Sequence, residues 1–373
     1  PARSWSWNFP VGTGVAPRDI PAELLPDIFK TTGGETDWQD VACFAALRSR
    51  FCVISGGPGT GKTTTVARIL ALAVRLHAGK DFRIRLAAPT GKAASRMSEA
   101  LASAFPGESL PPELKTNLSQ DAQTVHRLLG WSARGFIHGP DNPLPLDMLV
   151  VDEASMLDLE LAARLRDALP DHAGLVLLGD RNQLASVEAG AVLASLCRED
   201  VVNAFSPDFA ADAAKACAHG LPVTGSPALL TDHVVELKKN WRFGADSGIA
   251  ALAEYIRKGE AERAAALLAT PRGGVMMKTC SGQAELVAEL APLLRKAFRS
   301  LGSETDPARA FEIFGALRLL SPVRRGPRGT ETLNRLAREA LGMLARWERG
   351  HEKLFKDMHD KAFEEYAGMP WGG

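Results

Sequence analysis

The sequence lacks the cysteine pattern and the long apolar runs that mark several protein classes. Its five cysteines, at positions 43, 52, 197, 217 and 280, form no CxxC pair and no metal-ligand spacing. This excludes a disulfide scaffold and a zinc module, and it indicates reduced thiols that mostly fill the core. No apolar run is long enough to span a bilayer and no signal peptide is present. We therefore expect a cytoplasmic protein without a membrane partner.

An excess of charge is also absent, since 44 basic and 44 acidic residues give a net charge of zero. This balance excludes attachment to nucleic acid by bulk charge alone, but it leaves room for a local basic groove. With 373 residues, 46% of them hydrophobic, the chain has an ordinary soluble composition and is long enough for two domains. It begins at Pro1 without an initiator methionine, as expected of a fragment or a processed product.

One glycine-rich segment, Val53-Ile-Ser-Gly-Gly-Pro-Gly-Thr-Gly-Lys-Thr-Thr-Thr65, has the spacing of a phosphate-binding loop. The apolar run before it predicts a short buried strand, and residues 63–74 predict a helix. In such a loop, backbone N–H groups converge on phosphates at the helix N-terminus. Lys62 would reach the outer phosphates, and the Thr63 hydroxyl would hold Mg²⁺. The sequence therefore predicts binding and hydrolysis of a nucleoside triphosphate, with contacts from Gly56, Gly57, Pro58, Gly59, Thr60, Gly61, Lys62, Thr63 and Thr64.

Strands and helices alternate from about residue 37 to residue 197. This alternation predicts an α/β fold with a parallel sheet and helices on both faces. A short crossover helix is expected at residues 119–130. The expected strands lie near residues 51–55, 84–88, 147–151 and 175–179.

Changes in composition divide the chain into four parts. Residues 1–35, rich in Pro, Gly and Thr, form an irregular lead-in and possible end of an upstream domain. Residues 36–198 form the first domain. Residues 199–345 form a second, helix-rich domain that starts with an insertion and contains a strand at 316–321. Residues 346–373 form a charged helical tail.

Two adjacent carboxylates close an apolar strand in Leu149-Val-Val-Asp-Glu-Ala-Ser155. At this strand end, Asp152 would hold magnesium through a water and Glu153 would polarise the attacking water. A solvated loop is the alternative, but the strand and the upstream phosphate loop favour catalysis. A later strand ends in a polar turn where Gln183 would sense the outer phosphate. Asp180 and Arg181 fit an ordinary turn equally well.

Five segments resemble, in order, the motifs of superfamily 1 helicases, and in particular those of the RecD family, the alpha subunit of exodeoxyribonuclease V. They are 56–65, Ala88-Pro-Thr-Gly-Lys-Ala-Ala94, Thr124-Val-His-Arg-Leu-Leu129, Asp152-Glu-Ala-Ser155 and Gly179-Asp-Arg-Asn-Gln183. The resemblance covers roughly residues 36–342. It implies a P-loop NTPase with a RecA-like parallel sheet, followed by a second, incomplete RecA-like domain.

The same resemblance implies roles for individual residues. Gln39 would read the adenine, and Arg242, in Leu237-Lys-Lys-Asn-Trp-Arg-Phe243, would reach the outer phosphate from the second domain. The DNA-facing positions would be Thr90, Lys92, Thr124 and His126. For these, a helix N-cap, a solvated lysine and a core histidine are the alternatives. Trp131 and Trp241 are either base-stacking platforms or buried packing residues.

The function implied is that of an ATP- and Mg²⁺-dependent helicase that moves 5′ to 3′ on single-stranded DNA within a heteromeric helicase–nuclease. Its catalytic residues would be Lys62, Thr63, Asp152, Glu153, Gln183 and Arg242. Two late motifs of the family, including one with a second phosphate-contacting arginine, are not found. Losing such an arginine slows phosphoryl transfer about a thousandfold or more. A non-catalytic nucleotide- or DNA-binding remnant, a relaxase helicase module and a stand-alone RecD-like helicase therefore remain alternatives.

Overall fold

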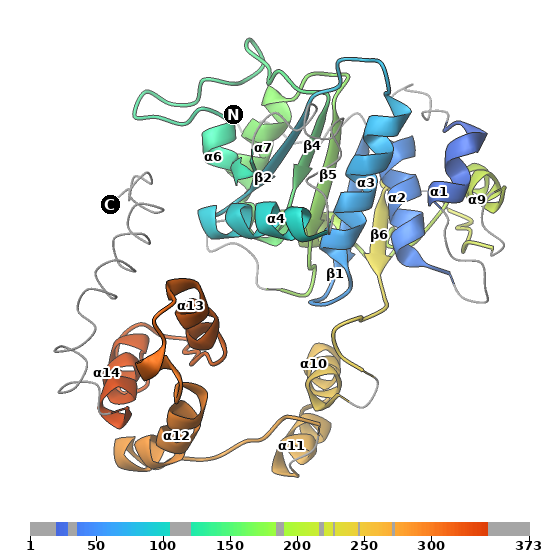
Figure 1. Cartoon of the computed structure of the whole chain (residues 1–373). Coiled ribbons are helices and arrows are strands. Elements are labelled where there is room, and N and C mark those ends of the chain that lie inside the picture. The colour runs from blue at the N-terminus through green and yellow to red at the C-terminus, as the bar shows by residue number, and fades with distance from the viewer. Residues whose placement is uncertain are drawn as a thin grey trace, which may run out of the picture. The chain divides into compact units, whose positions relative to one another are not determined.

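The computed structural model describes residues 20–28, 36–104, 121–183, 190–215, 220–226, 228–244, 247–270 and 273–341. The chain forms two compact units, Pro1–Val275 and Met276–Gly373 (Figure 1). The expected tail at 346–373 lies outside the described residues, as does most of the lead-in.

A six-stranded sheet forms the centre of the first unit, in the order β3-β2-β4-β5-β1-β6. Its neighbouring strands are all parallel, which confirms the predicted sheet class. The four expected strands are confirmed within a residue or so at each end, and β3 and β6 complete the sheet. The strands are β1 (Phe51–Gly56), β2 (Ile84–Ala88), β3 (Gln123–Thr124), β4 (Met148–Val151), β5 (Gly174–Gly179) and β6 (Val234–Leu237).

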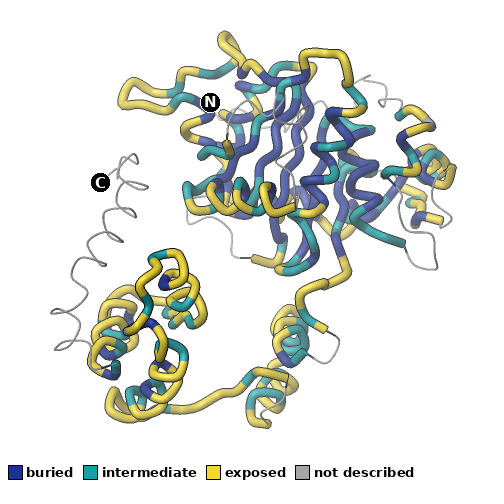
Figure 2. The backbone as a smooth tube through the Cα atoms, viewed as in Figure 1, coloured by how far each residue is buried: buried dark blue, intermediate teal, exposed yellow. Residues whose placement is uncertain are grey.

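Helices cover both faces of this sheet, because its strands are apolar on both sides. Along β1, Cys52 and Ile54 enter one hydrophobic core, whereas Phe51 and Val53 enter the other. The central strands β1, β4 and β5 are accordingly buried along their length (Figure 2). The first core includes side chains of α2 (Trp38–Arg48), α3 (Lys62–Leu76), α4 (Gly91–Ala104) and α9 (Pro207–Ala214), and the second those of α6 (Val125–Leu128), α7 (Leu159–Ala168) and α8 (Val192–Leu196).

Short polar side chains define where several of these helices begin. The Asp37 carboxylate accepts from the backbone N–H of Gln39 at the start of α2, and Asp158 accepts from that of Leu161 at the start of α7. These caps satisfy N–H groups that have no partner inside the helix. The first unit also contains η1 (Ala22–Leu24), α1 (Leu25–Ile28), η2 (Ala154–Met156), α10 (Gly248–Lys258) and α11 (Ala261–Ala269).

In the first unit, two expectations about secondary structure and one about a domain boundary were wrong. Residues 22–28 of the lead-in are helical rather than irregular, because Ile28 is fully buried in the first core. In the predicted crossover helix, residues 123–124 instead pair with β2 as β3, which leaves one helical turn as α6. The boundary after residue 198 also divides the sheet, since β6 pairs with β1 and the compact unit extends to Val275.

The described part of the second unit is helical. It contains α12 (Gln283–Ala297), η3 (Leu301–Ser303), α13 (Pro307–Gly315) and α14 (Thr330–Ala340), with a small core around Ala291, Leu294 and Ala340. The predicted strand at 316–321 is not formed. Within the residues described there, no neighbouring strand offers a hydrogen-bonding edge, and Leu320 is 90% exposed. None of the helices described in either unit is long and apolar enough to cross a membrane.

Candidate nucleotide-binding site

The candidate site lies at the carboxyl edge of the sheet. Because the strands are parallel, the segments that follow β4, β5 and β1 emerge side by side at this edge. These segments begin with Asp152, Asp180 and the glycine-rich loop, respectively. The fold therefore brings together three motifs that lie far apart in the sequence, at residues 56–65, 152–153 and 180–183.

The glycine-rich loop has a backbone that larger residues disfavour. Gly59 and Gly61 have φ angles of 81° and 85°, in the left-handed region. A Cβ atom on Gly56 would lie 2.5 Å from Thr60 Oγ1, which donates to the Gly57 carbonyl over 2.8 Å. The loop thus curls tightly over the N-terminus of α3, the geometry that gathers backbone N–H groups around an anion.

Lys62 supplies the positive charge of the loop. Its Nζ donates to the carbonyl oxygens of Gly56 over 2.5 Å and of Gly57 over 3.3 Å, so the ammonium lies over the loop. Thr63, in the first turn of α3, is half-buried, and Thr64 is exposed. The loop therefore combines a cation, a hydroxyl and the backbone N–H groups of a helix N-terminus, which are the groups that bind phosphates.

Asp152 and Glu153 lie beyond β4 in an environment that favours their neutral forms. Burial raises the pKa of Asp152, although the N–H of Glu153 donates to its Oδ1 over 2.8 Å and Lys62 lies nearby. Burial and the Asp152 charge raise the pKa of Glu153. The backbone of Glu153 is left-handed, with φ of 52°, which is uncommon for this residue type. Such strain is often found at functional sites.

The segment after β6 contacts the glycine-rich loop directly. The backbone N–H of Trp241 donates to the Gly59 carbonyl over 2.7 Å, and Asn240 Nδ2 donates to the Pro58 carbonyl over 2.9 Å. Asn240 Oδ1 accepts from the N–H of Arg242 over 2.9 Å, which fixes the turn that carries this arginine.

Arg242 therefore reaches the loop from the first unit, and its expected origin in a second domain was wrong. The reason is the strand pairing: β6 lies beside β1, with Leu237 opposite Gly56, so the residues after β6 emerge next to the loop. Arg242 itself is exposed.

Gln39 and Trp241 lie at the loop around Gly61. Gln39 Nε2 donates to the Thr60 carbonyl over 3.1 Å. A Cβ atom on Gly61 would meet Gln39 Nε2 and would lie 3.6 Å from Trp241 Cδ1. The Trp241 ring is 58% exposed, with Lys239 Nζ 3.9 Å from its centroid. Buried packing is therefore wrong for Trp241, whose exposed ring lies beside the loop.

The polar turn after β5 lies close to the loop. The buried Asp180 has Oδ2 4.0 Å from the position of a Cβ atom on Gly57. Asp180 also organises its own turn. Its Oδ1 accepts from the N–H of Asn182 over 3.0 Å, and its backbone carbonyl accepts from the N–H of Gln183 over 3.1 Å. The Gln183 side chain is exposed at the end of this turn.

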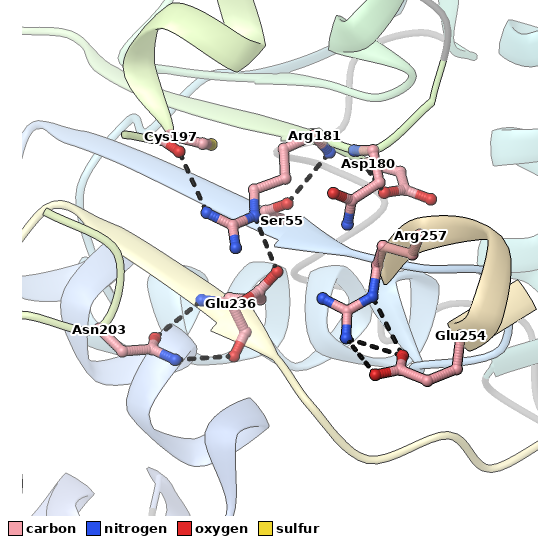
Figure 3. A network of polar contacts seen from close by, with 9 residues as sticks. Ser55, Asp180, Arg181, Cys197, Asn203, Glu236, Glu254 and Arg257 are labelled. Atoms are coloured by element: carbon pink, nitrogen blue, oxygen red, sulfur yellow. Dashed lines mark hydrogen bonds and ion pairs between the residues drawn. The ribbon is translucent and has the colours of Figure 1, made fainter. Parts of the chain in front are cut away.

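Arg181, Ser55 and Glu236 form a polar network that the sequence analysis missed (Figure 3). Arg181 was left as a possible turn residue, and the other two were not singled out. The available signal was Glu236 itself, a carboxylate within the otherwise apolar run Val234–Leu237.

The candidate DNA-facing residues lie toward the other end of the same edge, where β2 and β3 pair with Ala88 opposite Thr124. Thr90 and Thr124 both act as helix caps, with Oγ1 accepting from Ala93 N over 3.3 Å and from Arg127 N over 3.2 Å, respectively. Lys92 is exposed at the start of α4.

A surface aromatic cluster accompanies these residues. His126 is exposed, and its ring centroid lies 6.1 Å from that of Trp131 and 6.2 Å from that of Phe136. Trp131 is 53% exposed. The core alternative for His126 and the buried alternative for Trp131 are therefore wrong.

Comparison with known proteins places this geometry in a family. A family model described as an AAA domain matches residues 39–189. The RecBCD enzyme subunit RecD of Haemophilus influenzae is 36% identical over 338 residues, covering 84% of this chain and 52% of that protein. That of Mycolicibacterium smegmatis is 40% identical over 334 residues, covering 86% and 53%. The ATP-dependent RecD2 DNA helicase of Deinococcus radiodurans is 40% identical over 149 residues, covering 40% and 18%.

The chain thus spans about half the length of the RecD subunits that it matches. Conversely, the match extends over more than four-fifths of this chain. This chain belongs to the RecD family of superfamily 1 helicases.

Proposed function

We propose that this chain is the ATP-hydrolysing motor of a DNA helicase that works as a subunit of a RecBCD-type helicase–nuclease. The observation that carries the proposal is the convergence of the glycine-rich loop, the Asp152–Glu153 pair and the Arg242 segment at one edge of the sheet. The names of the matching RecD subunits support the choice of complex.

In this proposal, Lys62 and the loop N–H groups bind the phosphates of ATP. Gln39 and the exposed Trp241 ring contact its adenine base. Thr63 and Asp152 would hold Mg²⁺, whose charge offsets that of the phosphates as the bond to the outer phosphate breaks. Among the described residues, no group of three or more His, Cys, Asp or Glu side chains is arranged for a metal. This fits Mg²⁺, which is usually bound by one or two carboxylates, water and substrate phosphates.

Glu153 would orient and polarise the attacking water. A raised pKa suits this task, because a base is most effective when its pKa approaches the working pH. Gln183 would sense the outer phosphate from the turn after β5. Arg242 would neutralise the charge that develops on that phosphate, as arginines do in related reactions.

ATP hydrolysis by the full chain, with and without single-stranded DNA, tests the proposal. Lys62→Ala should abolish turnover, whereas Lys80→Ala, an exposed lysine beyond the far end of α3, should not. Undiminished hydrolysis by Lys62→Ala would refute the assignment. Nucleotide binding without turnover in the unaltered chain would favour the non-catalytic alternative.

Single-stranded DNA is proposed to bind toward the β2–β3 end of the edge, with 5′ to 3′ movement. The exposed Lys92, His126 and Trp131 support this, since they offer a cation and stacking surfaces. Lys92→Ala should weaken DNA binding and reduce the slope of log K against log salt by about 1 if it contacts a phosphate. An unchanged salt slope in fluorescence anisotropy titrations would rule out that contact.

Among the related helicases, a subunit role is favoured over a stand-alone one. The RecD subunits match 84% and 86% of this chain, whereas the RecD2 helicase matches 40%. Co-purification with the other subunits of a RecBCD-type enzyme tests this choice. A chain that unwinds DNA fully on its own would favour the stand-alone alternative.

A further inference from the structure

Arg181 bridges two strands that do not touch each other. In the sheet, Ser55 of β1 lies opposite Gly179 of β5 on one side and opposite Glu236 of β6 on the other. Arg181, two residues beyond Gly179, extends over the end of β1. Its backbone N–H donates to Ser55 Oγ over 3.2 Å, and its Nε lies 3.0 Å from Glu236 Oε1 (Figure 3).

Both partners of this ion pair are held in place. The side chains of Arg181 and Glu236 are each 19% exposed, and Arg181 Nη1 donates to the Cys197 carbonyl over 3.2 Å. Asn203 fixes Glu236 from the outside: its Oδ1 accepts from the Glu236 N–H over 2.8 Å, and its Nδ2 donates to the Glu236 carbonyl over 3.2 Å. A shift of Arg181 would therefore strain the end of β6.

The two ends of the bridge lead to different parts of the proposed ATPase site. Arg181 belongs to the turn that Asp180 organises and that ends at Gln183. Glu236 precedes Leu237, the partner of Gly56, and the Asn240–Arg242 segment that contacts the loop follows. We propose that Arg181 is a positioning residue that couples the Gln183 turn to the Arg242 segment, so that both approach the outer phosphate together. This inference rests on the proposed ATPase function.

A positioning role predicts a specific kinetic signature. The glycine-rich loop, Lys62 and the hydrogen bonds from Asn240 and Trp241 to the loop do not involve the bridge, so ADP affinity should fall much less than kcat when the bridge is broken. Misplacement of catalytic groups by about 1 Å can cost up to about a hundredfold in rate. We therefore expect kcat to fall about ten- to a hundredfold with a nearly unchanged dissociation constant for ADP.

The test uses the full chain and variants at both ends of the bridge. Arg181→Gln and Glu236→Gln should each lower kcat, and Arg181→Lys should retain part of it, because an ammonium keeps the charge but not the several donors of a guanidinium. The exchanged pair, Arg181→Glu with Glu236→Arg, should recover part of the rate lost in the single variants. ADP binding and urea unfolding, measured on every variant, report whether the site is intact.

Arg257→Ala is the matched control. Its guanidinium lies in the same electrostatic neighbourhood, since its pKa is raised mainly by hydrogen bonds to Glu254 and further by the charges of Glu236 and Asp180. Its guanidinium donates hydrogen bonds to Glu254 within α10, however, and not to the bridge. A general loss of positive charge would slow Arg257→Ala equally, whereas the proposed bridge predicts a rate close to that of the unaltered chain.

The outcomes separate the two proposals. If the unaltered chain hydrolyses ATP and the Arg181 variants retain full kcat, or lose ADP affinity and stability in proportion to kcat, the positioning role is wrong and the ATPase function stands. If the unaltered chain and Lys62→Ala show the same turnover, or neither shows any, the ATPase function fails and the positioning role fails with it.

Discussion

Gly59 offers a sharp test of whether the segment after β6 is part of the proposed nucleotide site. A Cβ atom at this position would lie 2.6 Å from Arg242 Cβ and 2.9 Å from Asn240 Oδ1. Gly59→Ala therefore forces the segment away from the loop. It also places alanine at a φ of 81°, where L-residues are disfavoured.

Gly79→Ala is the matched control, because Gly79 has a similar φ of 78° and nothing lies within 4 Å of its Cβ position. The left-handed backbone costs alanine about 1–2 kcal/mol, partly offset by about 0.4–1 kcal/mol from the stiffer unfolded chain. Gly79→Ala should thus lose about 1 kcal/mol of unfolding free energy. Gly59→Ala should also lose the hydrogen bonds from Trp241 N–H and Asn240 Nδ2, at about 1 kcal/mol each, or about 3 kcal/mol in total.

Urea unfolding followed by tryptophan fluorescence measures this difference, and titration with ADP measures its effect on the site. Gly59→Ala should bind ADP more weakly, with Gly79→Ala unchanged. Equal stability losses in the two variants would refute the contact argument. Asn240→Ala leaves the glycine in place, and it too should weaken ADP binding. If it binds ADP normally, the loop itself rather than the segment explains the Gly59→Ala defect.

The remaining predictions concern buried charge and the exposed tryptophan. Burial raises the pKa of Asp152 in the folded chain. The ionised carboxylate therefore opposes folding at neutral pH, and the stability that the protonated carboxyl contributes is lost as pH rises through the raised pKa. Asp152→Asn should therefore raise the urea midpoint at pH 7 in EDTA while abolishing turnover, and a lower midpoint would contradict this sign. Because the pKa of Glu153 is also raised, turnover should fall on the acid side at a higher pH than an ordinary glutamate would give, as a pH–rate profile would show. Burial lowers the pKa of His233, whose Nδ1 lies 2.8 Å from the Phe51 carbonyl, so stability should be lost as pH falls from about 6.5 through the lowered folded value. His233→Gln should flatten that dependence in urea titrations, and an equally steep one would exclude His233 as its source. Trp241→Ala should weaken ADP binding about tenfold or more, because the adenine loses the ring on which it stacks, and Trp241→Phe should bind nearly as well as the unaltered chain. Equal ADP affinity in the unaltered chain and both variants would exclude stacking.

The parts of the fold that could be predicted from sequence are those whose signals lie in consecutive residues. The apolar run Phe51–Gly56, the glycines after it and the helix beyond form one continuous pattern, and the strand before Asp152 is equally self-contained. The identity of β6 as a member of the first sheet was not readable in this way. A run of four mostly apolar residues predicts a strand, but nothing in the local sequence specifies which other strand will pair with it.

The same limit explains the errors around the site. Arg242 was placed in a second domain by the resemblance to helicase motifs and by a change in composition near residue 199, neither of which reveals that β6 pairs with β1. His126 and Trp131 have apolar neighbours that favour a core, yet their own side chains lie on the exposed side of the short helix and loop. The Arg181–Glu236 bridge joins residues 55 positions apart across a third strand, which no spacing rule anticipates.

The position of β6 also affects how the chain is made. On a ribosome, β1 would stay at the open edge of the growing sheet until Val234–Leu237 has been synthesised, because β5 covers only its other side. At about 5–20 residues per second, the time between the synthesis of Gly56 and that of Leu237 is on the order of ten to forty seconds. Throughout it, the unpaired backbone N–H and C=O groups of β1 and an incomplete form of the proposed ATP site are exposed to other chains. Newly made protein is therefore most prone to aggregate during this interval, and the last strand to arrive both closes the sheet and completes the site.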